Sequence, residues 1–170
     1  MASSLSTLGI IHTAISVVAL VFAAVSLVRD ARIIPHSKTG IYYTITNVLA
    51  CVTSFGLSKE GGFNPGHAIA IMILVLLAVS YAMGHAWTDR PVALYIQTFL
   101  MTTTVFLSLV PAINETLTHL PPSHPIAESK ASPAVQAGLK LLVVVYLAGL
   151  LLQFFKIRGW VKKHSQKISF

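Results

Sequence analysis

Histidines are the residues of this sequence best suited to chemistry, because neutral imidazole binds transition metals and haem iron. His12 stands inside a long apolar run, and His67 and His85 stand 18 residues apart, which places them on one face of a helix. Ionisable side chains in such runs are costly in lipid and often mark a functional site. We therefore regard five histidines as candidate haem or metal ligands: His12, His36, His67, His85 and His119.

Two charged residues occur at a depth similar to that of His12 and His67. Glu115 ends one apolar run, and Lys140 lies about two helical turns into another. We expect these four side chains to converge on one polar cavity that opens outward, if the helices are ordered so as to bring them together. The order of the helices does not follow from the sequence. The other residues expected to line this cavity are Tyr43, Asn47 and Gln136.

Five apolar stretches have the length needed to cross a bilayer, since about 20 helical residues span the ~30 Å hydrocarbon layer. In lipid, a helix satisfies its own backbone hydrogen bonds, so each stretch is expected to be helical. The predicted class is an all-α integral membrane bundle, with helices at about residues 8–28, 41–57, 68–87, 92–113 and 134–155.

The composition excludes a water-soluble globule. Of 170 residues, 55% are hydrophobic and 10% are charged, whereas soluble domains carry about a quarter charged residues. The mean hydropathy is +0.76. The tails and loops are too short for a second domain, so residues 1–170 are expected to form one transmembrane domain. Cys51 is the only cysteine of the sequence, which excludes a disulfide within the chain.

Positive charge is distributed unevenly between the two sides of these helices. The first and third loops and the C-terminal tail hold nine Lys and Arg residues, and the opposite loops hold only Lys59 and Lys130. Because Lys and Arg are retained in the cytoplasm, the N-terminus is expected outside and the C-terminus inside. The net charge of +7 is explained by this flanking pattern, not by nucleic-acid binding. The tail from Lys156 to Lys167 is expected to lie on anionic lipid.

Small and polar residues recur at helical spacing and predict the faces by which the helices pack. On the first helix this face includes Ala19, Ala23 and Ser26, and on the second it includes Tyr43 and Asn47. The second helix is the most polar of the five. We expect it to be the most enclosed helix, shielded from lipid by the other four.

The segment His36-Ser-Lys-Thr-Gly40-Ile-Tyr42 resembles the His-x-x-x-Gly-x-Tyr helix start of a group of small uncharacterised bacterial inner-membrane proteins. The run Phe63-Asn-Pro-Gly-His67 is similar to their next helix start. The resemblance covers roughly residues 30–90, and Thr88-Asp89-Arg90 replaces a charged Arg-His-Arg segment of that group. It implies a multi-pass bundle with recurrent histidines in a bacterial inner membrane. The resemblance does not indicate any particular activity.

Three classes of function fit these patterns. The first is a membrane haem or metal protein, with His12 and His67 as an outer pair and His36 and His85 as an inner pair. The second is a zinc-dependent membrane hydrolase, in which Glu115 acts as general base. The third is a small-molecule transporter, ligand binder or accessory subunit without a cofactor. Whether the protein is an enzyme or an oligomer is left open by the sequence.

Overall fold

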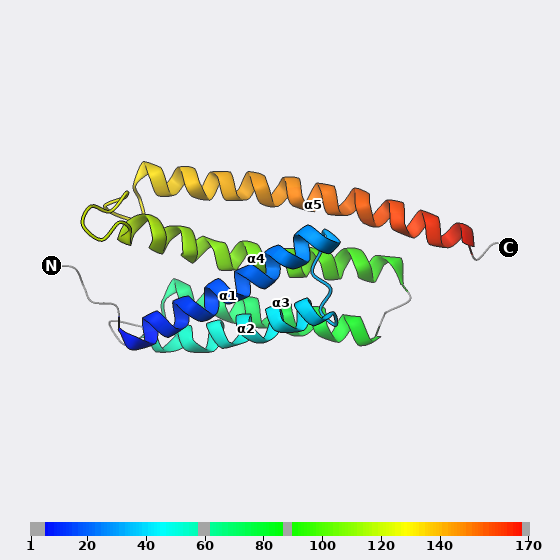
Figure 1. The fold of residues 1–170 in the computed structure, drawn as a ribbon, viewed down its shortest axis with the longest axis horizontal. Helices are drawn as coiled ribbons and strands as arrows, with labels where there is room; N and C mark the ends of the chain where they lie inside the picture. Colours follow the sequence, from blue (N-terminus) through cyan, green and yellow to red (C-terminus); the bar gives the residue numbers. More distant parts are fainter. Residues whose placement is uncertain (1–5, 58–61, 87–89, 168–170) are drawn as a thin grey trace.

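In the computed structural model, long helices lie along one axis and form a single bundle (Figure 1). The structure describes residues 6–57, 62–86 and 90–167, without the side chains of residues 85–86 and 164–167. Five described helices are long and apolar enough to cross a membrane, which confirms the predicted all-α class. The elements are α1 (Thr7–Asp30), α2 (Lys38–Ser54), the 3-10 helix η1 (Phe55–Leu57), α3 (Pro65–Ala86), α4 (Pro91–His119) and α5 (Pro133–Lys167).

Two of the predicted helix ends are wrong by several residues. The sequence placed the end of the fourth helix at residue 113 and of the fifth at residue 155, but α4 continues to His119 and α5 to Lys167. Hydropathy detects only the part of a helix that suits lipid. In α5, backbone hydrogen bonding continues into the polar tail, where Lys and Gln are good helix formers. The second helix also ends early, because residues 55–57 form the 3-10 turn.

Local capping explains where three of the helices begin. The side chains of Ser6, Ser37 and Asn64 each accept a hydrogen bond from the backbone N–H three residues later, at 3.1 Å in every case. Proline occupies the first position of the last three helices, where its missing N–H has no intrahelical partner to lose. These prolines are Pro65, Pro91 and Pro133.

Helices that follow one another in the chain are neighbours in space. α1 packs on α2, α2 on α3, α3 on α4, and α4 on α5, with a smaller contact between α1 and α4. Figure 1 shows α5 on the outer side of α4, and it shows the start of α1 and the end of α5 at opposite ends of the bundle. We call the end that carries η1 the η1 end, and the end where α1 and α5 finish the basic end.

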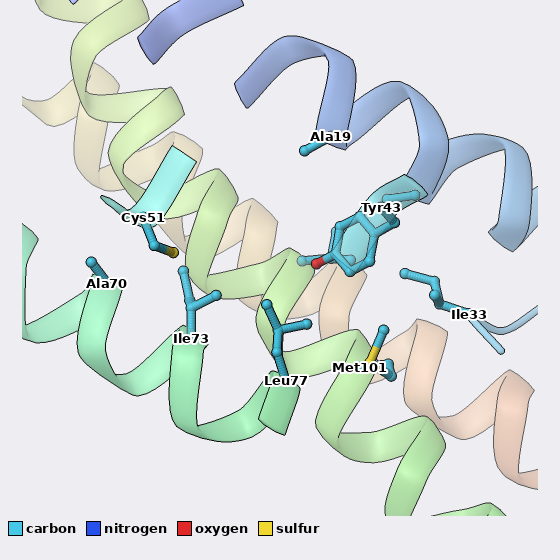
Figure 2. Close-up of a cluster of buried hydrophobic side chains, with 10 residues drawn as sticks. Ala19, Ile33, Tyr43, Cys51, Ala70, Ile73, Leu77 and Met101 are labelled. Carbon is cyan, nitrogen blue, oxygen red and sulfur yellow. The ribbon is translucent and has the colours of Figure 1, made fainter. Parts of the chain in front are cut away.

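The interior combines small and polar residues with a few large apolar ones, and the surface carries many large apolar side chains. Ala19, Ala23 and Ser26 of α1 are buried, as are Tyr43 and Asn47 of α2, which confirms the predicted packing faces. Small side chains let helix backbones approach closely, which is how helices associate where lipid removes the usual hydrophobic drive. Figure 2 shows part of the core between α1 to α4, where the labelled residues include Ile33, Ile73, Leu77 and Met101.

The prediction that the second helix is the most enclosed is wrong. In the most apolar part of each described helix, 28% of the residues of α2 are buried, the same share as in α4 and less than the 33% in α3. Ile45, Leu49 and Val52 of α2 are each about half exposed. The polar residues of α2 fill only one face of the helix, so that face alone needs shelter and the apolar face is left for lipid.

Candidate functional site

His12 and His67 both lie at the η1 end, next to the end of α2. Nδ1 of His12 is 3.0 Å from the hydroxyl of Thr53. Because that hydroxyl already donates to the carbonyl of Leu49, Nδ1 of His12 is the donor of this bond. His67 is buried, its ring 5.3 Å from that of Phe55. The two histidines therefore contact residues that are two positions apart in the chain, Thr53 and Phe55.

Glu115, Gln136 and Lys140, which were expected to line a cavity with these histidines, do not contact them in the structure. Glu115 is exposed near the end of α4, and it pairs with His119 of the same helix at 3.3 Å and with Lys130 of the following connection at 3.8 Å. Gln136 is exposed and donates to the carbonyl of Lys130. Lys140 is exposed on α5, and the lysine that contacts Glu115 is Lys130.

The inner histidine pair is only half described. His36 packs its ring against Tyr81 with centroids 4.3 Å apart, and its Nε2 lies 3.2 Å from the carbonyl oxygen of Tyr81. His85 belongs to α3, but its side chain lies outside the described residues. Among the described residues, no group of three or more His, Cys, Asp or Glu side chains is arranged to hold a metal ion.

Tyr43 and Asn47, expected to line a cavity, form a hydrogen-bonded network between α2 and α4. The Tyr43 hydroxyl is 2.7 Å from Oγ1 of Thr104, and Nδ2 of Asn47 donates to the Tyr43 hydroxyl at 2.9 Å. The hydroxyl of Ser108 donates to the carbonyl of Thr104 at 2.9 Å and lies 3.4 Å from Oδ1 of Asn47. Since Thr104 donates its own proton to the carbonyl of Met101, the Tyr43 hydroxyl donates to Thr104. These groups satisfy one another, which is the arrangement expected of interhelical packing.

A second polar contact, between α4 and α5, borders a pocket. Oγ1 of Thr102 donates to Oε1 of Gln153 at 2.9 Å. Gln153 is only 6% exposed, and no described residue accepts a hydrogen bond from its Nε2 amide. Gln153 lines this pocket, so this donor is available to a ligand.

The pocket has a volume of about 410 Å³, within the usual range for small-ligand sites. We call it the basic pocket, because it lies at the basic end, between the end of α1, the start of α4 and the second half of α5. Its polar lining consists of Asp30, Arg32, Gln153, Lys156 and Lys163. Its other lining residues are Ala31, Leu94, Phe155, Ile157, Gly159 and Trp160.

The charges of the basic pocket leave it net positive. Its one acidic residue, Asp30, is bound by Arg29, whose Nη2 and Nε lie 2.7 Å and 3.0 Å from Oδ2. Arg32 is half-buried, and the structure gives it no hydrogen bond to any described residue. Burial lowers the pKa of the Arg32 guanidinium, and the charge of Asp30 opposes that shift. Three cations, Arg32, Lys156 and Lys163, therefore face one carboxylate among the residues that line the pocket.

Sequence reasoning missed the basic pocket. It placed the tail on anionic lipid but did not join that tail to α1. The signal was present along α5, where Gln153, Lys156, Trp160 and Lys163 recur at helical spacing on one face. Arg32 could not be added to this face from the sequence, because its position depends on the left-handed turn at Ala31 that ends α1.

Comparison of the chain with models of known protein families, with curated proteins and with solved structures found no match.

Proposed function

We propose that this chain is a multi-pass protein of the bacterial inner membrane that binds a small anionic ligand, as a ligand binder or accessory subunit rather than an enzyme. Five helices suited to lipid support the membrane location. The N-terminus faces outward and the C-terminus faces the cytoplasm, because nine of the twelve Lys and Arg residues flank the helices at the basic end.

The observation that carries this proposal is the basic pocket. Its wall combines the amide donor of Gln153 with three cations that outnumber its one carboxylate: Arg32, Lys156 and Lys163. Every one of these groups donates hydrogen bonds, and a phosphate or carboxylate accepts them. An anion in the pocket would accept a hydrogen bond from the Gln153 amide and lie beside the half-buried guanidinium of Arg32 at the same time. The histidines at the η1 end offer less, since both rings already contact protein groups.

Trp160 provides the test, because it lines the pocket and its fluorescence responds to a bound ion. The protein, purified in a neutral detergent, is titrated with inorganic phosphate, and the same titration is made with sodium chloride at matched ionic strength. We expect a saturable emission change with phosphate alone, absent from Trp160→Phe and strongly weakened in Arg32→Gln. Arg90→Gln is the control, since Arg90 is exposed and lies outside the pocket. Equal responses to phosphate and chloride would contradict the proposal.

A further inference from the structure

The residues of α5 that line the basic pocket run from an apolar stretch of the helix to its polar end. Its deepest polar residue on α5, Gln153, lies in an apolar run between Leu152 and Phe154, and its outermost residue is Lys163. Ten residues of helix correspond to about 15 Å. Trp160, half exposed, lies between them, and tryptophan is typical of the headgroup level. The pocket therefore crosses the interface between hydrocarbon and headgroups.

One part of the pocket wall is apolar and open to the side. Leu94, Phe155 and Ile157 line the pocket, and the side chain of Phe155 is 56% exposed. α5 packs along α4, and Figure 1 shows it on the outside of the bundle, so this wall continues into the surface that faces lipid. A soluble anion makes no use of such a wall. A molecule with an anionic headgroup and an acyl chain contacts both the apolar and the cationic residues.

We infer that the occupant of the basic pocket is an anionic glycerophospholipid of the cytoplasmic leaflet. Its phosphate lies among Arg32, Lys156 and Lys163, the Gln153 amide donates to its phosphate or glycerol oxygens, and one acyl chain runs along Phe155. Basic pockets between helices on the cytoplasmic side are the usual sites for such headgroups. This inference rests on the proposed function, and it names the chemical class of the ligand.

Two adjacent lysines allow a matched test. Lys163 lines the pocket, whereas Lys162, equally exposed, does not. The protein is reconstituted in phosphatidylcholine bilayers with and without phosphatidylglycerol, released into neutral detergent, and its retained lipids are counted by native mass spectrometry. A basic residue near an anionic headgroup contributes about fivefold to binding. We expect Lys163→Gln to lower phosphatidylglycerol retention about fivefold and Arg32→Gln to lower it about tenfold or more, with little change for Lys162→Gln.

Each other outcome overturns the inference in a distinct way. Equal losses in Lys162→Gln and Lys163→Gln would mean that the whole tail attracts lipid without a site. Phosphate binding without a preference for phosphatidylglycerol over phosphatidylcholine would refute the lipid but keep the proposed function. Binding of neither would remove both. Thermal unfolding in phosphatidylcholine alone checks that each variant folds, and the exposed position of Lys163 predicts no change there.

Discussion

Replacing Tyr43 by Phe is the most direct test of how the bundle is held together. The substitution removes one oxygen and keeps the ring, which is fully buried between α1 and α4. That oxygen donates to Thr104 of α4 and accepts from Asn47 of α2. The substitution therefore removes one hydrogen bond between helices and one within α2, with almost no change in packing volume. We expect the free energy of unfolding to fall.

The expected loss follows from the two bonds and the groups left behind. Hydrogen bonds between membrane helices contribute about 0.6 kcal/mol on average and up to about 1.7 kcal/mol. The amide of Asn47 also loses its acceptor in the interior, and a buried unsatisfied donor costs about 1–3 kcal/mol. The Asn47 oxygen keeps its 3.4 Å contact with the Ser108 hydroxyl in the variant. We expect Tyr43→Phe to destabilise the protein by about 1–3 kcal/mol.

The assay is equilibrium unfolding in mild detergent, followed by circular dichroism as a denaturing detergent is added. Tyr42→Phe is the matched control, since the adjacent Tyr42 is 54% exposed, and we expect a change within about 0.5 kcal/mol. A double-mutant cycle with Thr104→Val should give a coupling energy of about 0.5 kcal/mol or more. If Tyr43→Phe behaves like Tyr42→Phe, or the coupling is zero, the network does not stabilise the bundle.

Three further outcomes are expected. In the same unfolding assay, Gly40→Ala should destabilise the protein by about 1–3 kcal/mol, because the new Cβ would overlap the carbonyl oxygen of Ile34. Gly149 has open space around it, so Gly149→Ala should be neutral or stabilising by up to about 1 kcal/mol. Reporter proteins fused to the two chain ends should report opposite compartments, and the same compartment for both would refute the topology. Protein purified with haem and zinc supplied should show neither a Soret band nor stoichiometric zinc. A cofactor lost in both His12→Ala and His67→Ala would instead establish the histidine site.

The helices were predictable because each depends on residues that are close together in the chain. Apolar runs of the right length, a serine or asparagine before the first turn, and proline at position one are all local signals, and they located the starts at Pro91 and Pro133 within one residue. The packing faces were predictable for a similar reason, since helical geometry converts spacing along the chain into direction. The helix ends beyond the membrane were not, because there hydropathy no longer marks the helix.

The candidate site was harder to predict, since it depends on which helices meet. His12 and His67 share the η1 end because α1 and α3 both pack on α2. Successive helices run in opposite directions, so the start of α1 and the start of α3 lie at the same end of the bundle. Glu115 and Lys140 were matched by depth alone, and depth does not decide a partner. In the fold, Lys130 in the connection between α4 and α5 is the basic residue that reaches Glu115.

By itself, the sequence determined that this protein is a bundle of five apolar helices, with its positive charge gathered at one end and its small and polar residues turned inward. These properties follow from composition and helical periodicity, which are independent of how the helices are arranged. Only the tertiary structure decided that Arg32 joins Gln153, Lys156 and Lys163 in one pocket. Arg32 and Lys163 are separated by 131 positions in the chain, and their meeting depends on the turn after α1 and on the packing of α5 along α4.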